Sequence, residues 1–384
     1  MGPTRTAHRE TIPSPLDYVM KTLDSRFEPH CSYSFEMLMK LVLMAIGAGS
    51  QNVLAISHWL HDQQEALLAL GFGDRDGHGR LPSQATVYRF FWMLEDTIDG
   101  LERTLHHWAA DVLRVSQPAG EVICLSMDGK QLKGSGRSRK GAKAIQLLSC
   151  FVHGLGLSLG QERVQSDEAK AAKELLAQLP PEGLPWIFTG DAAFAERPLV
   201  ETVLAKGGMY LLDLKDNLSE VKSYAAWAFG LARCDQDSRF ESDEVRSGEV
   251  WLRELETRPA TPDVTNDFPG AKQFVRCIRT VVRKDTGEIR FQETEYALTS
   301  SPAPASRLYR FWRGHWCIEN RLHHKRDTIW REDACRTRKG AQAFAALRNL
   351  MLSLFHLNAP EQVLRQTRRC SVQPQRLLSL LGLA

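Results

Sequence analysis

The sequence predicts an α/β protein, with a helical N-terminal domain at residues 16–118 and a strand-rich domain at residues 119–384. Two observations predict this division. Before residue 118, apolar residues recur three or four positions apart, as in helices that bury one face. After residue 120, short apolar runs of strand length alternate with helical segments. Residues 1–15 are polar and contain prolines, so we expect them to form a disordered arm.

The helices of the N-terminal domain follow from its apolar spacing. The clearest periodic runs are Phe35–Ile46, Val53–Leu60 and Val87–Leu94. Ser83 follows a loop rich in Gly and Asp and supplies a helix N-cap. The helix after it carries Gln84 and Arg89, which would read DNA bases if this helix lay in a groove. A helix that only packs on its neighbours is an equally good interpretation, because helix-turn-helix signals are weak without their turn glycine.

The second domain begins with three strands, followed by a helix, a strand, a helix and a strand. In chain order these segments are Val122–Met127, Ile145–Val152, Leu157–Val164, Ser166–Leu179, Trp186–Thr189, Ala195–Lys206 and Met209–Leu214. This order is typical of an RNase H-like core, in which one catalytic Asp lies on the first strand and a second just after the fourth. Asp128 and Asp191 fall at those two places.

Residues from about 240 to 298 interrupt this core with further strand patterns joined by turn signals. The strands are Val250–Leu255, Gln273–Val282 and Glu288–Leu298. We expect an all-β insertion between the fifth core strand and a helix over Ser306–Trp330, which carries Glu319. A strongly apolar segment, Ala341–Leu357, predicts a long final helix.

The composition excludes several classes of protein. None of the eight cysteines forms a Cys-x-x-Cys pair, which argues for reduced thiols in a cytosolic protein and against a zinc ribbon or disulfide scaffold. The N-terminus lacks a signal-peptide pattern, and the most apolar stretch, Met37–Ala48, is too short to cross a bilayer. We therefore expect a cytoplasmic protein without a membrane partner. The net charge of +3 is too small to indicate a nucleic-acid partner, so local clusters carry that argument.

Three carboxylates from distant positions, Asp128, Asp191 and Glu319, are candidates for a two-metal site. Phosphodiester chemistry uses two hard cations about 3.5–4 Å apart, held by oxygen ligands. Each Asp also has an ordinary interpretation, since Asp128 precedes Gly129 as in a hairpin turn and Asp191 is placed to cap the next helix. Their combination with Glu319 favours the metal site.

The residues around Glu319 recur at three- and four-residue spacing, which predicts a single helix face. They are Trp312, His315, Trp316, His323, Arg326, Asp327 and Trp330. Acids, imidazoles and cations in such a stripe are costly to bury unless they bind metal, phosphate or each other. The rival interpretation is a zinc site made from His315, Cys317, His323 and His324, but its spacing suits no common zinc module.

A run of six basic residues without an acid follows Asp128 and is spread through Gly and Ser. These residues are Lys130, Lys133, Arg137, Arg139, Lys140 and Lys143. A flexible cationic loop beside a metal site suits the phosphate backbone of DNA, although a solvated hairpin tip stays open as the alternative. A second cationic set, Arg331, Arg336, Arg338 and Lys339, follows the Glu319 helix and extends the predicted DNA track. We expect Arg336 and Arg338 of this set to bind DNA, together with Arg326 on the helix itself.

Combined motifs over residues 26–357 resemble the transposases of H-repeat-associated insertion sequences, a branch of the DDE transposases. The motifs are Met127-Asp-Gly-Lys-x-Leu-x-Gly-Ser135, Gly190-Asp-Ala192, Leu214-Lys-x-Asn217, His315-Trp-x-Ile-Glu-Asn-x-Leu-His323 and Arg331-Glu-Asp-x-x-Arg336-x-Arg338. The resemblance implies Asp128, Asp191 and Glu319 as the metal-binding triad, supported by Asn320, His323 and Asp327.

From these features we expect a DNA transposase that cleaves the ends of an insertion sequence and transfers the strands into target DNA. Two Mg²⁺ ions, for which Mn²⁺ is expected to substitute, would serve the triad. The expected partner is double-stranded DNA, both element ends and target, bound by a homodimer in the nucleoid. Two alternatives stay open: a domesticated DNA-binding descendant that no longer transposes, and a metal-dependent nuclease of the same fold.

Overall fold

The computed structural model describes the whole chain except residues 1–11, 24–30, 119, 138–140, 180–182 and 384. It forms two compact units. The first unit comprises residues 1–119, 129–163 and 319–384, and the second comprises residues 120–128 and 164–318. One boundary therefore falls beside the predicted domain boundary at residues 118 and 119. The first unit nevertheless also includes segments from the predicted catalytic domain.

The first unit begins with six helices, as the apolar spacing predicted. They are α1 (Pro15–Leu23), α2 (Phe35–Gly47), α3 (Val53–Asp62), α4 (Gln64–Ala69), α5 (Gln84–Asp96) and α6 (Ile98–Ser116). Side-chain caps fix several of their starts. Ser34 and Asn52 cap α2 and α3, and the predicted cap Ser83 accepts a hydrogen bond from the Thr86 amide. Of the predicted arm, residues 1–11 lie outside the described residues, whereas the Pro13 carbonyl accepts a hydrogen bond from Trp108.

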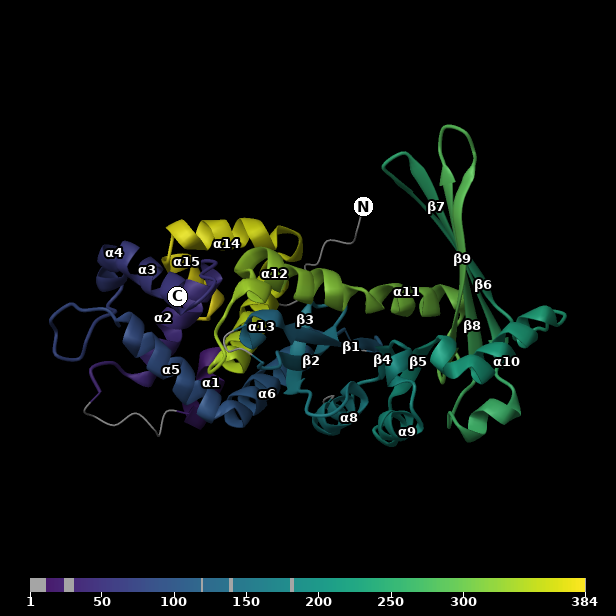
Figure 1. Ribbon diagram of the computed structural model, residues 1–384, viewed down its shortest axis with the longest axis horizontal. Coiled ribbons are helices and arrows are strands. Elements are labelled where there is room, and N and C mark those ends of the chain that lie inside the picture. The colour runs from purple at the N-terminus through teal and green to yellow at the C-terminus, as the bar shows by residue number, and fades with distance from the viewer. Residues whose placement is uncertain (1–11, 24–30, 119, 138–140, 180–182, 384) are drawn as a thin grey trace. The chain divides into compact units, whose positions relative to one another are not determined.

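The core of the first unit is built around a helix that is buried on every side. This helix is α13 (Ala341–Asn358), and its residues from Ala341 to His356 are all buried. The rings of Phe344 on α13 and Phe91 on α5 stack with their centroids 4.3 Å apart. Three further helices complete the unit: α12 (His324–Trp330), α14 (Val363–Val372) and α15 (Gln375–Leu380). The N-terminal helices thus share one core with the C-terminal ones (Figure 1).

The first unit also contains the antiparallel strands β2 (Ile145–Val152) and β3 (Leu157–Arg163), and the short helix α7 (Lys133–Gly136). Strand β1 (Ile123–Leu132) begins in the second unit and ends in the first. Its last residue, Leu132, packs with two residues of β2 and two of α13, namely Ile145, Leu147, Ala341 and Ala345.

The second unit is a mixed sheet in the order β1-β4-β5-β9-β8-β7-β6. Strands β1, β4 (Trp186–Gly190) and β5 (Met209–Leu214) are parallel. Helices α8 (Glu168–Gln178) and α9 (Arg197–Ala205) lie on one face of these three strands and α11 (Ala305–His315) lies on the other (Figure 1). The strand and helix order predicted between residues 120 and 214 is confirmed. Parallel pairing explains why these strands are nearly continuous apolar runs.

The region predicted as an all-β insertion is an antiparallel meander that continues the same sheet. Its strands are β6 (Arg239–Arg246), β7 (Glu249–Pro259), β8 (Gln273–Arg283) and β9 (Ile289–Thr299), and β9 pairs with β5. Helix α10 (Ser219–Gly230) precedes it. The sequence pattern predicts β7, β8 and β9 but not β6, whose largely exposed residues carry no apolar alternation.

The segment Ser306–Trp330 is helical, as predicted, but it is not one regular α-helix. The segment is divided into α11, a π-helical stretch over Ile318–His323, and α12. A π turn holds more residues than an α turn, so a three- and four-residue spacing does not stay on one face across it. The exposures agree: Trp316 is 51% exposed, whereas Trp330 is fully buried. The predicted single functional face is therefore corrected.

Within the described residues, no helix has the length and apolar character needed to cross a membrane.

Candidate active site

Asp128 and Asp191 lie at equivalent positions of two neighbouring parallel strands. Ser126 of β1 pairs with Thr189 of β4. Asp128 follows two residues later on β1, and Asp191 two residues later, just after the end of β4. Neighbouring strands are about 4.7–4.9 Å apart, so this register brings both carboxylates to the same edge of the sheet. The second unit thus places together the two predicted metal-binding residues that it contains.

The turn after β4 orients the Asp191 side chain. Its Oδ1 accepts a hydrogen bond of 2.9 Å from the Ala193 amide and so caps a short 3-10 helix over Ala192–Phe194. The ordinary interpretation of Asp191 as a cap is therefore correct, but it occupies only one oxygen. The other, Oδ2, lies 3.9 Å from Lys215 Nζ, beyond hydrogen-bonding distance. One carboxylate oxygen is fixed by the backbone and the other is available to a cation.

Asn217 holds the same turn from β5. Its Nδ2 donates a hydrogen bond of 2.9 Å to the Ala192 carbonyl. The motif Leu214-Lys-x-Asn217 therefore has a structural reason: Lys215 lies beside the Asp191 carboxylate and Asn217 fixes the backbone that follows it. These two residues position Asp191 without being candidate ligands.

His315, at the end of α11, completes the group in the second unit. Its Nδ1 lies 3.2 Å from the Thr189 hydroxyl, which also donates to the Leu125 carbonyl on β1. Burial lowers the pKa of His315, although the nearby charges of Asp128 and Asp191 act to raise it. The lowered pKa favours the neutral imidazole. It adds no positive charge to a site that gathers two carboxylates.

Asp213 is a further acid near this group, and the sequence analysis missed it. Burial, followed by the charge of Glu295, raises the pKa of Asp213 to about 7, and a hydrogen bond from Trp312 acts in the opposite direction. The signal for this residue was present in the sequence, because Asp213 is a lone acid inside the apolar strand Met209–Leu214.

Glu319 and Asn320 belong to the first unit, where both are exposed. They lie in the π-helical stretch, whereas His323 at its end is buried. Short π segments inside helices are frequent at functional sites. An exposed glutamate at this place differs sharply from Glu332, which is 2% exposed and fully paired.

Asp327 binds a lysine from the strand that carries Asp128. Lys130 Nζ donates a hydrogen bond of 2.6 Å to Asp327 Oδ2 and lies 3.7 Å from Asp333. Lys130 is buried, with a side chain only 10% exposed, so its predicted contact with DNA is corrected to an internal ion pair. Lys133 is exposed and also paired, 2.6 Å from Asp333.

The prediction that Arg326 contacts DNA is contradicted as well. Arg326 is fully buried, donating to Asn349 at 3.1 Å and pairing with Glu332 at 2.7 Å. Arg348 pairs with the other oxygen of Glu332 at 2.9 Å and donates to the Gln51 carbonyl at 2.7 Å. Burial alone would raise the pKa of Glu332, but the two guanidinium groups outweigh it and lower this pKa to about 2.

The remaining predicted DNA-binding residues differ in their exposure to solvent. Arg139 and Lys140 lie outside the described residues. The exposed ones are Arg89, Arg137, Lys143, Arg336 and Arg338, and Gln84 is half-buried. Arg338 donates to the carbonyls of Ser135 and Lys143, which ties the cationic loop to the segment after α12. Gly134 permits this approach, because a Cβ there would meet the Cys335 carbonyl oxygen at 1.9 Å.

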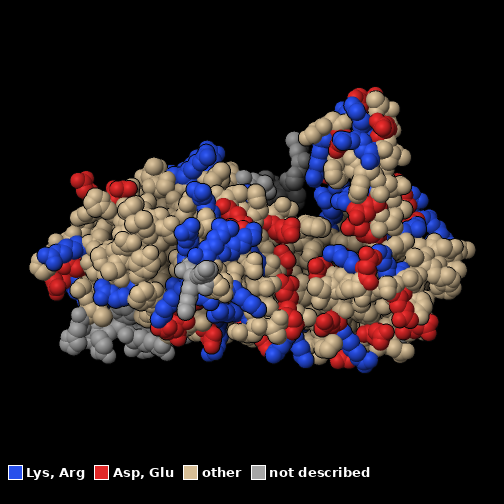
Figure 2. Space-filling view, in the orientation of Figure 1, with Lys and Arg blue, Asp and Glu red and all other residues tan. Residues whose placement is uncertain are grey.

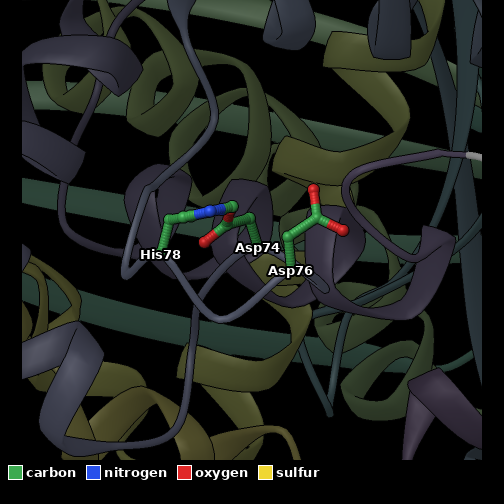
Figure 3. A group of neighbouring side chains, drawn as sticks. All are labelled: Asp74, Asp76 and His78. Atoms are coloured by element: carbon green, nitrogen blue, oxygen red, sulfur yellow. The ribbon is translucent and has the colours of Figure 1, made fainter.

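A separate group of possible metal ligands lies in the loop between α4 and α5. The ligand atoms of Asp74, Asp76 and His78 are within 4.8 Å of one another. The Asp74 carboxylate already faces His78 at 3.2 Å and accepts the Arg80 amide at 3.0 Å, while Asp76 points away from that pair (Figure 3). These contacts explain the group as loop structure, and we assign no metal to it.

Comparison with known proteins places this geometry in a family. Residues 123–355 match the family model described as "Transposase DDE domain", and residues 16–109 match the model "DDE_Tnp_1-associated". "Putative transposase YncI" of Escherichia coli O157:H7 is 25% identical over 90% of this chain and 87% of its own. "H repeat-associated putative transposase YhhI" of E. coli K12 is 26% identical over 65% of this chain and 68% of its own.

A piggyBac transposase in a synaptic complex with hairpin DNA aligns with 96% of this chain and 78% of its own, at 10% identity. Its TM-score of 0.45 is too low to carry an argument about the fold. The transposase model, in contrast, covers more than half of the chain and contains both strands of the Asp128–Asp191 pair. The chain therefore belongs to the DDE transposases, enzymes of DNA transposition.

Proposed function

We propose that this transposase cleaves DNA at the ends of an insertion sequence and joins those ends to target DNA, using Asp128, Asp191 and Glu319 as its metal-binding residues. The observation that supports this proposal is the parallel register of β1 and β4, in which Asp128 and Asp191 each follow two residues after the paired residues Ser126 and Thr189. The proposal includes an RNase H-like core, with the β6–β9 meander inserted ahead of the segment that bears Glu319.

The donor set fits divalent cations such as Mg²⁺. Carboxylate oxygens are the ligands that hard cations prefer. The lowered pKa of His315 favours its neutral form. Lys215 lies 3.9 Å from Asp191 Oδ2, beyond hydrogen-bonding distance, so among the described residues no hydrogen bond from a cation to this oxygen is seen. When bound, two such ions would activate the attacking water or 3′-hydroxyl and stabilise the leaving oxygen.

The protein's own contribution is positioning. The Ala193 amide and Asn217 hold the turn that bears Asp191, and half-buried His315 contacts the Thr189 hydroxyl two residues before it. The exposed cations Arg137, Lys143 and Arg336 are proposed to contact the phosphate backbone of double-stranded DNA. We propose that a homodimer binds the two element ends within the nucleoid.

The test is cleavage of a labelled duplex that carries the element's end, in Mg²⁺ or Mn²⁺. Asp128→Asn, Asp191→Asn and Glu319→Gln should each abolish cleavage and leave duplex binding intact. Asp76→Asn, which removes an exposed carboxylate elsewhere, is the matched control and should cleave normally. Full cleavage by any of the three variants would remove that residue from the site.

The same assay separates the alternative functions. Cleavage without joining to target DNA would indicate a nuclease of the same fold. Specific binding without cleavage in either metal would indicate a descendant that no longer transposes.

A further inference from the structure

Helix α14 carries a cationic face for which neither the active site nor the family models account. It begins at Val363, beyond the last residue matched by the transposase model, 355. The chain from residue 362 to its end contains four arginines and no Asp, Glu or Lys. The arginines are Arg365, Arg368, Arg369 and Arg376. Lys and Arg side chains gather over α14, and over α12 and the segment after it, in the view of Figure 2.

The helix has two sharply different faces. Val363, Gln366, Thr367 and Cys370 are buried, at the three- and four-residue spacing of one packed stripe. The opposite face exposes only arginines and two apolar residues: Arg365, Arg368, Arg369, Leu364 and Val372. Leu364 is 48% exposed and Val372 is 70% exposed. A helix face that served only for solvation would instead mix acids with its bases.

Hydrogen bonds hold α14 firmly in the first unit. Gln366 Nε2 donates to the carbonyls of Phe355 and Ala359 at 3.0 and 2.8 Å, and its Oε1 accepts from Asn358 at 2.9 Å. At the other end, Trp59 Nε1 donates to the Ser371 carbonyl at 3.4 Å. The arginines are therefore presented on a rigid support.

Among the side chains that the structure describes, which do not include that of Glu361 just before α14, no acid pairs with these arginines. Arg365 and Arg376 donate only to amide oxygens, those of Gln362 and Gln373. Several exposed arginines elsewhere are paired, among them Arg114 with Asp111, Arg197 with Glu201 and Arg283 with Asp285. Like charges three and four residues apart on a helix cost about 0.2–0.5 kcal/mol per pair. A face with this uncompensated repulsion is suited to an anionic partner.

We propose that α14 binds the phosphate backbone of duplex DNA through Arg365, Arg368 and Arg369, without regard to base sequence. Guanidinium groups donate two parallel hydrogen bonds to phosphate. The exposed face of α14 has no Asn, Gln or carboxylate to read base edges, so the contact holds DNA without selecting its sequence. This inference rests on the proposed action on DNA, and it adds a binding surface outside the matched transposase domain.

The experiment measures how salt weakens binding of the full-length protein to a random-sequence duplex. The test variant is Arg365→Gln/Arg368→Gln/Arg369→Gln. The matched control, Arg114→Gln/Arg197→Gln/Arg283→Gln, removes the same charge from paired, exposed arginines. Each lost phosphate contact lowers the slope of log K against log salt by about 0.9. For two or three contacts, the parent loses about 10- to 40-fold more affinity than the test variant between 50 and 200 mM salt.

A third variant separates charge from structure. Arg365→Lys/Arg368→Lys/Arg369→Lys keeps the positive charge and should retain most of the parental slope. Equal slopes of log K against log salt for the parent and the glutamine variant would overturn the inference. A lysine variant whose slope falls as much as that of the glutamine variant would also overturn it. A changed preference for end sequence over scrambled duplex would also overturn a contact confined to phosphates. If the parent itself neither binds nor cleaves DNA, the proposed function fails instead.

Discussion

The two units differ in how they accommodate carboxylates that lie close to other ionisable groups. In the second unit, Asp128 on β1 and Asp191 just after β4 lie at the same edge of the sheet, near His315, whose lowered pKa favours the neutral form. Among the described residues, no cation is hydrogen-bonded to Asp191 Oδ2. In the first unit, Glu332 is enclosed between Arg326 and Arg348, and each of its oxygens is paired within 3 Å. Carboxylates that the protein leaves to an external cation are candidates for chemistry, whereas carboxylates that it pairs internally stabilise the fold.

The largest effect on stability should come from breaking the internal cluster. Glu332→Gln leaves two buried guanidinium groups without a counter-charge, and removing one partner of a buried pair costs about 3–5 kcal/mol. Denaturant unfolding measures this loss directly. Asp191→Asn is the comparison: it retains a side-chain oxygen for the Ala193 amide, so its free energy of unfolding should stay within about 0.5 kcal/mol of the parent. Similar effects of the two variants would refute the distinction between the clusters.

A half-buried acid of the first unit, Glu102, has neutral hydrogen-bond partners and a raised pKa that favours its protonated form. Glu102 accepts hydrogen bonds from Gln161 and Gln342 at 2.7 and 3.0 Å. Burial raises the pKa of Glu102 to about 8, whereas hydrogen bonds from these two glutamines oppose the rise. In the unfolded chain this carboxyl ionises near its ordinary value of 4.5. The folded state therefore retains a proton that the unfolded state has lost, between pH 4.5 and about 8.

The free energy of unfolding should accordingly fall as the pH rises through that window, by at most about 1.4 kcal/mol per pH unit. Glu102→Gln preserves the shape and an acceptor oxygen but cannot ionise, so its free energy of unfolding should fall less steeply with pH. The difference in free energy of unfolding between the variant and the parent should be largest at pH 8. Glu65→Gln, at an exposed position of α4, is the control and should follow the parent. A parallel fall in Glu102→Gln would show that this carboxyl is ionised in the folded protein.

Local patterns explain what could be predicted from the sequence. The strands between residues 120 and 214 and the Ser83 cap depend on neighbouring residues, and both are confirmed. The register that joins Asp128 to Asp191 follows from parallel pairing of β1 and β4, which the predicted strand order anticipated.

Long-range packing explains what could not be predicted. The position of Arg326 in the sequence resembles that of a surface cation, but the folded chain buries it against Asn349 on α13. Arg348, which pairs with the same glutamate, is likewise buried and donates to the Gln51 carbonyl after α2. The π-helical stretch adds a residue that apolar periodicity does not reveal. Helix α14 escaped prediction because three arginines interrupt its short apolar stripe.

The next prediction concerns DNA recognition by α5. Unlike the buried arginines of the same unit, Arg89 on the outer face of α5 is exposed and could contact DNA. Val87 and Phe90 are buried as predicted, and Arg89 is exposed. If this helix reads bases, Arg89→Ala and Gln84→Ala should each reduce the preference for end sequence over scrambled duplex by about 1–3 kcal/mol. Arg103→Ala, on the exposed side of α6, should not change that ratio. An unchanged ratio in all three variants would return α5 to a packing role.

The smallest expected effect compares two cations of one loop that differ in pairing. Lys133 is 2.6 Å from Asp333, whereas exposed Arg137 has no ion pair among the described residues. If Arg137 contacts a phosphate, Arg137→Ala should lower the salt slope of DNA binding by about 0.9. Lys133→Ala should lower it less, because its charge is already offset, and Lys133→Ala/Asp333→Ala should leave it near the parental value. An equal change of the salt slope in both single variants would mean that the ion pair with Asp333 does not reduce the contribution of Lys133 to DNA binding. An unchanged slope in both would return the loop to a solvated hairpin tip.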